Sequence, residues 1–109
     1  MPYMKGREGK VIIITGASSG IGLATALRLA EDGNKVYGIS RNEYSNDKFT
    51  CLVGDVNDES RMVSLFEEIE KREGRIDALI NNAGFGIAGA IADTKKENVE
   101  AIVNTNLTA

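Results

Sequence analysis

Residues 11–22 read VIIITGASSGIG, and this stretch supplies the pattern from which the rest of the chain can be interpreted. Its first five residues are apolar or β-branched, which is typical of a strand buried on both faces. Glycines at positions 16, 20 and 22 follow, and apolar residues at helical spacing begin at Ile21. The stretch therefore predicts a buried strand, a glycine-rich turn and a helix, in that order.

Each glycine of the turn has a physical reason to be there. Gly16 permits a tight exit from the strand, Gly20 allows the backbone to approach a pyrophosphate, and Gly22 brings the helix close to the sheet. The first N–H groups of a helix lack intrahelical partners and carry partial positive charge, so they favour phosphate oxygens. Ser18 and Ser19 can add hydroxyl donors. The alternative interpretation is a glycine turn that binds no ligand.

The remaining sequence alternates between strand and helix patterns. The expected strands are residues 11–15, 35–40, 50–53 and 76–80, and the expected helices are residues 20–32, 58–73 and a final helix that begins at Thr94. The T-x-x-E sequence at Thr94 is a capping box, which is typical of a helix N-terminus. Alternating strands and helices in about 100 residues favour an α/β fold with a parallel sheet and right-handed crossovers.

Composition and charge exclude several classes of function. The chain has 109 residues, enough for one domain, and its hydrophobic content of 42% is that of a globular protein. Thirteen basic against sixteen acidic residues give a net charge of −3, so the basic excess of a nucleic-acid binder is missing. There is no His, and Cys51 is the only cysteine, which excludes His-based catalysis, a His-ligated metal and an internal disulfide. The longest apolar run, residues 11–14, is too short to cross a bilayer, and we expect a cytoplasmic protein with no membrane partner.

Three motifs of the chain resemble fingerprints of the short-chain dehydrogenase/reductase family. Residues 15–22 read TGASSGIG and resemble its TGxxxGxG sequence. Asp55 and Val56 are similar to the Asp–hydrophobic pair that contacts the adenine ring in this family. Residues 81–84 read NNAG and match the motif that supports the central sheet and lines the cofactor. The resemblance extends over residues 9–109 and implies a nicotinamide dinucleotide as cofactor.

The resemblance also implies the arrangement of the sheet. We expect a Rossmann-like parallel sheet of order 3-2-1-4 with flanking helices, truncated after the helix that follows the fourth strand, which is the family's fourth helix. Residues 1–9 would form an N-terminal extension, and residues 10–109 a partial NAD(P)-binding domain. The fourth strand would then be an exposed edge. Because unpaired edges invite association, we expect a homo-oligomer.

The choice of nicotinamide depends on a position about 20 residues beyond the glycines, where an acidic residue bonds the ribose of NAD. Here that position falls at Ser40 and Arg41, with no carboxylate before Glu43. Arg41 can pair with a 2′-phosphate through two charge-assisted hydrogen bonds, and Ser40 can add a hydroxyl. In the family an Arg at this point marks NADP preference, usually with a second basic residue where this chain has Ser19. We predict NADP over NAD; the alternative is that Arg41 is a solvated loop residue.

The predicted cofactor-binding residues are Gly16, Ser18, Ser19, Gly20, Ile21, Gly22, Ser40, Arg41, Asp55, Val56, Asn82, Ala83 and Gly84. Of the family's catalytic groups, a Tyr, a Lys four residues later, a Ser and an Asn, only the Asn has a counterpart. Residues 106–109 resemble the family segment that carries this Asn, which implies that Asn106 maintains a proton-relay water; the alternative is a terminal Asn without a role. Tyr44 and Lys48 have the Tyr–Lys spacing, but they lie in a polar loop before the third strand. We therefore predict no catalytic role for this pair, and expect Lys48 at most to attract phosphate.

The sequence thus predicts the NADP(H)-binding portion of an oxidoreductase that transfers a hydride between the nicotinamide and a small-molecule carbonyl or alcohol. This chain alone is expected to lack turnover, because the Tyr that exchanges a proton and its Lys are missing. Two alternatives from other classes stay open: a nucleotide-binding half-domain without chemistry, and a fragment that mainly self-associates. No metal is expected.

Overall fold

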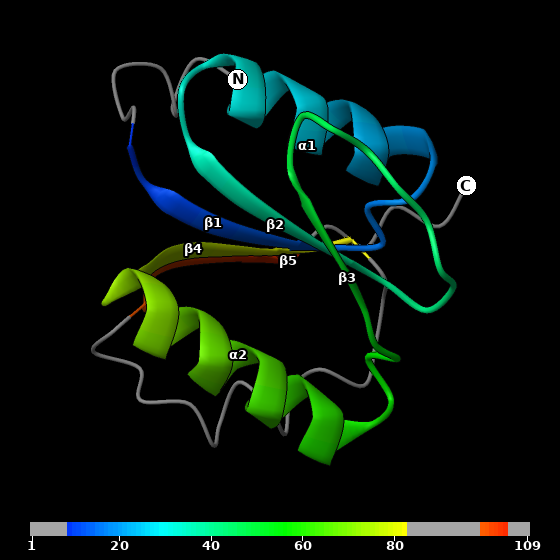
Figure 1. The fold of residues 1–109 in the computed structure, drawn as a ribbon, viewed down its shortest axis with the longest axis vertical. Coiled ribbons are helices and arrows are strands. Elements are labelled where there is room, and N and C mark those ends of the chain that lie inside the picture. The colour runs from blue at the N-terminus through cyan, green and yellow to red at the C-terminus, as the bar shows by residue number, and fades with distance from the viewer. Residues whose placement is uncertain (1–8, 83–98, 105–109) are drawn as a thin grey trace.

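The computed structural model describes residues 9–82 and the backbone of residues 99–104. Within these residues the structure has two helices and five strands: β1 (Val11–Thr15), α1 (Gly20–Glu31), β2 (Lys35–Ser40), β3 (Thr50–Val53), α2 (Glu59–Glu73), β4 (Ile76–Asn81) and β5 (Val99–Asn104). The sheet lies between α1 on one face and α2 on the other, as Figure 1 shows. The bounds of the first four strands match the prediction to within one residue.

The sheet has the order β3-β2-β1-β4-β5, and every neighbouring pair is parallel. β1 is central, with Ile13 opposite Tyr37 of β2 on one side and opposite Leu79 of β4 on the other. The predicted order 3-2-1-4 is therefore confirmed for the first four strands. All carboxyl ends lie at the same edge of the sheet, at the right in Figure 1.

The fifth strand contradicts the prediction of a final helix. Residues 99–104 form β5, which pairs with β4 so that Ile102 lies opposite Leu79. An exposed β4 edge would present a row of unpaired N–H and C=O groups, and pairing removes it. The β-branched residues of this segment suit a strand, so tertiary pairing outweighs the local helix signals. β4 is consequently not the edge of the sheet, and the capping box at Thr94 lies outside the described residues.

Two apolar clusters explain why the strand patterns read as continuous hydrophobic runs. Val11 and Ile13 belong to the cluster on the α2 face, together with Phe66 and Ile69 of that helix. Ile12 and Ile14 belong to the cluster on the α1 face. Alternate residues of β1 thus enter opposite layers, and all five residues of the strand are buried.

The ends of α2 match the sequence signals. Asp58 is the N-cap, and its side chain accepts a hydrogen bond of 3.1 Å from the backbone N–H of Arg61. The helix ends at Gly74, whose left-handed backbone is accessible to glycine at little cost. Its buried residues are Met62, Leu65, Phe66 and Ile69.

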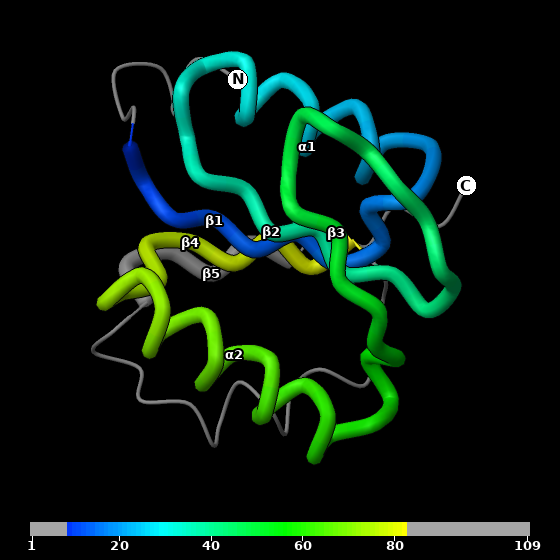
Figure 2. The backbone as a smooth tube through the Cα atoms, viewed as in Figure 1, coloured from blue at the N-terminus to red at the C-terminus, as the bar shows by residue number. Residues whose placement is uncertain are grey.

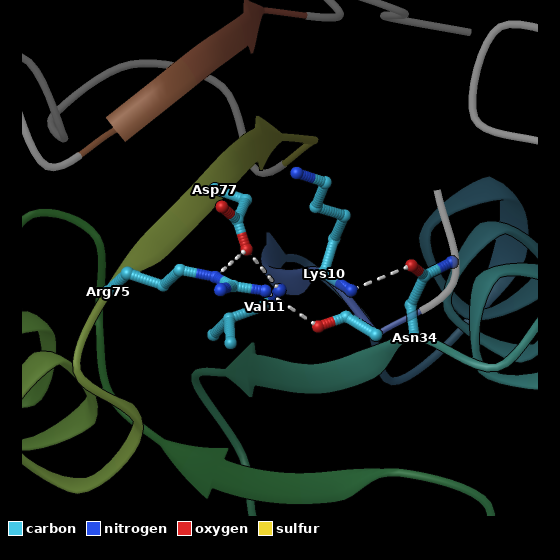
Figure 3. Close-up of polar contacts among 6 residues, drawn as sticks. Lys10, Val11, Asn34, Arg75 and Asp77 are labelled. Carbon is cyan, nitrogen blue, oxygen red and sulfur yellow. Dashed lines mark hydrogen bonds and ion pairs between the residues drawn. The ribbon is translucent and has the colours of Figure 1, made fainter. Parts of the chain in front are cut away.

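A buried carboxylate ties the start of β1 to β4. Asp77 accepts hydrogen bonds from the backbone N–H of Val11 at 2.7 Å and from Nε of Arg75 at 2.8 Å (Figure 3). Beside it, the backbone N–H of Lys10 donates to Oδ1 of Asn34 at 3.3 Å. These contacts lie at the amino edge of the sheet, where they stabilise the fold and leave the carboxyl edge open for a ligand.

Candidate functional site

A hollow of about 360 Å³ lies at the carboxyl ends of β1, β2 and β3. Its lining residues are Gly16, Ser18, Ser19, Ile39, Ser40, Arg41, Asn42, Gly54, Asp55, Val56 and Asn57. In open parallel sheets ligands bind outside the carboxyl ends of the strands, close to the point where the strand order reverses. The hollow has this location, because β1 is where the order turns from β2 and β3 towards β4.

The turn after β1 forms one wall of the hollow. Gly16 has a positive φ of 69°, and its N–H donates to the carbonyl oxygen of Ile39 at 2.8 Å. Ala17 is fully buried beneath the turn, whereas Ser18 and Ser19 are exposed. The turn therefore presents its two serines towards solvent and the hollow while its backbone is fixed to β2.

The start of α1 packs directly on this turn because residue 22 is a glycine. A Cβ at Gly22 would lie 2.0 Å from the carbonyl oxygen of Gly16 and 2.7 Å from Nδ2 of Asn82. Real Cβ atoms essentially never approach another heavy atom within 3.0 Å. The sequence-based reason for Gly22 was close approach of the helix to the sheet; the contacts found are with the turn after β1 and with Asn82, directly after β4, and the role of Gly22 in cofactor binding stays a prediction.

The N-terminus of α1 has donors that no side chain caps. Ser19 is the N-cap residue, with an extended backbone and no capping hydrogen bond from its side chain. The first turn of the helix contains no acidic residue. Its N–H groups and the positive end of the helix dipole can therefore interact with a phosphate group.

The end of β4 is tied to the same turn. Thr15 Oγ1 donates to Oδ1 of Asn81 at 2.8 Å and accepts from the backbone N–H of Asn82 at 3.1 Å. The side chain of Asn82 donates to the carbonyl oxygen of Gly16 at 3.4 Å. Asn82 thus contacts the turn after β1 through both its backbone and its side chain, and it does not line the hollow. Ala83, Gly84 and Asn106 lie outside the described residues.

Arg41 lies at the mouth of the hollow, directly after β2. Its side chain is exposed and makes no hydrogen bond or ion pair with any described residue, so the guanidinium keeps its full donor capacity for a ligand. The preceding residue, Ser40, is buried, and its hydroxyl donates to Oγ of Ser18 at 2.9 Å. This bond links the end of β2 to the turn after β1, and brings the predicted phosphate-binding residues of both strands together.

The segment after β3 forms the opposite wall. Oδ1 of Asp55 accepts a hydrogen bond of 2.9 Å from the backbone N–H of Asn57, which fixes the carboxylate beside the hollow. Val56 is buried in the α2-side cluster and contributes to the lining. Asp55 is the only acidic residue in the described lining, so a carboxylate faces the hollow from β3 and none faces it from β2.

The structure separates the sequence-predicted residues into two groups. Gly16, Ser18, Ser19, Ser40, Arg41, Asp55 and Val56 line the hollow. Gly20, Ile21 and Gly22 do not line it, and Ile21 is 54% exposed. Sequence reasoning missed Ile39, Asn42, Gly54 and Asn57. All four neighbour predicted residues at strand ends, so applying the carboxyl-end rule to whole segments would have found them.

Tyr44 and Lys48 lie where neither can take part in catalysis at this hollow. The hydroxyl of Tyr44 is buried, and burial, followed by the neighbouring Cys51 thiol, raises its pKa above 10. A catalytic Tyr needs the opposite, a lowered pKa. Lys48 lines a separate hollow of about 220 Å³ with Asn34 and Lys35, at the amino end of β2. Lys48 does not line the first hollow, and the expectation that it attracts phosphate stays a prediction.

In residues 9–82, no group of three or more His, Cys, Asp or Glu residues could hold a metal ion. Within the same part of the chain, neither helix has the length and apolar character needed to span a membrane.

The parallel sheet, the glycine-rich turn into α1 and the hollow at the switch in strand order define a Rossmann-type, dinucleotide-binding α/β protein. The family model described as short chain dehydrogenase matches residues 10–109. The chain thus belongs to the short-chain dehydrogenase/reductase family, whose members use NAD or NADP.

The relatives include enzymes and solved structures of this family. The chain is 46% identical over 100 residues to 3-ketodihydrosphingosine reductase of Bacteroides thetaiotaomicron, covering 91% of this chain and 37% of that protein. It superimposes with a TM-score of 0.70 on ligand-free aldohexose dehydrogenase of Thermoplasma acidophilum, at 33% identity and covering 85% of this chain and 36% of that one. The TM-score is 0.65, at 34% identity, with 3-ketoacyl-(acyl-carrier-protein) reductase of Brucella melitensis complexed with NADH, covering 72% and 35% of the two chains. The chain spans little more than a third of each of these three proteins.

Proposed function

We propose that this chain binds NADP(H) in the hollow beside β1, β2 and β3, with Arg41 and Ser40 facing the 2′-phosphate. The pyrophosphate would lie over Ser18, Ser19 and the N-terminus of α1. Asp55 and Val56 would face the adenine. The described residues fit this coenzyme, because serine hydroxyls and a guanidinium line the hollow, and the uncapped N-terminus of α1 begins directly after Ser19 at its edge.

The observation that carries the preference for NADP is the position of Arg41. It is the first residue after β2, it lines the hollow, and no described residue neutralises its charge. A carboxylate at the end of β2 would accept hydrogen bonds from a free ribose and repel a phosphate; here the residues at that place are a serine and an arginine. Hydrogen bonds to a charged group contribute about 1.5–3 kcal/mol, and a planar guanidinium can form two of them with one phosphate.

Calorimetric titration of the chain with NADP⁺ and with NAD⁺ tests this proposal. We expect tighter binding of NADP⁺, and we expect Arg41→Ala to weaken NADP⁺ by about 10- to 100-fold, the equivalent of one charge-assisted contact, while NAD⁺ changes little. The matched control is Arg72→Ala, which removes the same charge from the last turn of α2, where Arg72 and its partner Glu68 are both more than half exposed. Equal affinity of the wild-type chain for both coenzymes would show that Arg41 has no such role.

For the whole protein, the proposed activity is hydride transfer between the nicotinamide, which supplies or accepts the hydride, and a carbonyl or hydroxyl group of a small molecule. Support comes from the family and from the named relatives, which are reductases and a dehydrogenase. The proposed role of these 109 residues is to bind and orient the cofactor. Asn106 keeps its proposed role in the proton relay.

A further inference from the structure

The connection from β2 to β3, residues 41–49, carries Arg41 and contains two inward-facing aromatic side chains, Tyr44 and Phe49, among mostly exposed residues. Arg41, Asn42, Glu43, Ser45, Asp47 and Lys48 are exposed, whereas Tyr44 is partly buried and Phe49 is buried. Figure 2 shows that this connection runs along the α1 side of the sheet. Tyr44 packs there against the same apolar cluster as α1, with its ring 6.4 Å from that of Phe49.

The tip of Tyr44 occupies space that exists because residue 38 of β2 is a glycine. A Cβ at Gly38 would lie 2.7 Å from the Tyr44 hydroxyl oxygen, 2.5 Å from Cε1 of Phe49 and 2.8 Å from Cβ of Ala17. Ala17 belongs to the glycine-rich turn after β1, whose neighbouring residues Gly16, Ser18 and Ser19 line the hollow. The side chain of Tyr44 therefore reaches from the Arg41 loop to the foot of the phosphate-binding turn.

The phenol acts here mainly through its shape, because its hydroxyl is buried and makes no hydrogen bond of ordinary geometry with the described residues, although the Cys51 thiol and the backbone of Leu52 lie close enough to affect its pKa. The backbone hydrogen bonds outside the regular elements include none from residues 41–48, and the side chains of this loop add only that of Asn46, which accepts from the N–H of Lys48. The thiol of Cys51 in β3 also donates to the backbone carbonyl oxygen of Asn46 at 3.9 Å, so Tyr44 is the main apolar contact that holds the exposed part of the loop against the rest of the protein.

We infer that Tyr44 is a positioning residue for coenzyme selectivity: by anchoring the loop over Gly38 and against the glycine-rich turn, it holds Arg41 at the mouth of the hollow. The inference rests on the proposed function of Arg41 and adds a residue that does not line the hollow itself. A guanidinium on a loosened loop must be ordered when the ligand binds, and that entropic cost weakens its contact with a phosphate. NAD⁺ has a free ribose hydroxyl in place of the 2′-phosphate, and this hydroxyl forms no charge-assisted contact with Arg41. The affinity for NAD⁺ therefore does not depend on whether Tyr44 holds the loop in place.

The test compares Tyr44→Ala, Tyr44→Leu and Tyr44→Phe in the 109-residue chain, with two readouts. The first is the ratio of affinities for NADP⁺ and NAD⁺. The second is hydrogen–deuterium exchange of residues 41–49 without coenzyme, with the α2 amides as a reference for folding. Leu27→Ala is the control, because Leu27 packs on the same cluster from α1 and has no part in the loop.

We expect Tyr44→Ala to speed hydrogen exchange in residues 41–49. It should also lower the preference for NADP⁺ over NAD⁺ about tenfold, the size of one weakened charge-assisted contact. If the alanine variant does not fold, Tyr44→Leu should give the same two results. Tyr44→Phe, which keeps the ring, and Leu27→Ala should keep the wild-type ratio. Two results would overturn the inference while leaving the role of Arg41 intact. One is that Tyr44→Ala and Tyr44→Leu change neither the hydrogen exchange of the loop nor the ratio of affinities for NADP⁺ and NAD⁺. The other is that these variants bind both coenzymes equally more weakly. A wild-type chain without NADP⁺ preference would instead overturn the proposed function and this inference with it.

Discussion

Replacing Gly22 by alanine tests how tightly the start of α1 packs on the glycine-rich turn. The new Cβ would lie 2.0 Å from the Gly16 carbonyl oxygen, so helix and turn must separate by about 1 Å to reach 3.0 Å. Overpacking costs about 1–3 kcal/mol, and the upper end applies because the nearest atom belongs to the backbone. Alanine regains about 1 kcal/mol of helix propensity relative to glycine. The net loss of about 2 kcal/mol corresponds to a fall in melting temperature of about 8–16 °C for a domain of this size.

Thermal unfolding followed by circular dichroism measures this loss. Gly54→Ala is the control, because its Cβ would meet only the ends of two flexible side chains, Met62 Cε at 2.5 Å and Leu65 Cδ1 at 2.9 Å. These side chains can move aside, so we expect the control to lose less than about 1 kcal/mol. If Gly22→Ala melted at the same temperature as Gly54→Ala, the proposed contact between helix and turn would not exist in solution.

Three other properties can be checked in the same way. Burial raises the pKa of Tyr44, so the folded chain keeps a phenolic proton that the unfolded chain releases near pH 10. Above about pH 10 this proton should lower the free energy of unfolding by less than about 1.4 kcal/mol per pH unit. Burial and Glu73 also raise the pKa of Tyr37, so urea titrations of Tyr44→Phe should show a shallower fall that does not vanish. Asp77→Ala should lower the free energy of unfolding by about 1–3 kcal/mol, because it leaves the N–H of Val11 without its acceptor. Asp77→Asn keeps an acceptor of the same size, so its free energy of unfolding should fall by less. Equal falls in the two variants would assign the effect to the charge alone. The 109-residue chain should not oxidise NADPH with any carbonyl substrate, and measurable turnover would contradict the expectation that the proton-exchanging Tyr and its Lys are missing. The homo-oligomer expected from an open β4 edge loses that reason, because β5 pairs with β4.

The sequence was sufficient for those elements whose signals are local. The apolar run at residues 11–15 and the helical spacing over residues 58–73 each depend on neighbouring residues, and the structure confirms the strand and, to within one residue, the helix. Most predicted site residues after β1, β2 and β3 line one hollow because the carboxyl ends of parallel strands must meet at one edge. The role of these residues in cofactor binding stays a prediction.

The wrong and the missed elements depend on contacts between segments far apart in the chain. Residues 99–104 carry a helical spacing, yet they pair with β4, because an unpaired edge is a property of the assembled sheet and is invisible in a local window. The anchoring of Val11 by Asp77 spans 66 positions. Tyr44 stands at a spacing that imitates a catalytic pair, and only its burial over Gly38 shows that its hydroxyl is enclosed.

From its amino-acid order alone this chain determined a buried central strand, a glycine turn opening into a helix, and a family whose members use a nicotinamide dinucleotide. Local backbone preferences and the period of apolar side chains are sufficient for such features, since neighbouring residues carry them. Only the tertiary structure decided which strand closes the sheet, which buried carboxylate holds β1, and which aromatic ring fixes the loop that carries Arg41. Those outcomes depend on burial and on backbone groups finding partners across the fold, and both exist only once the layers have packed together.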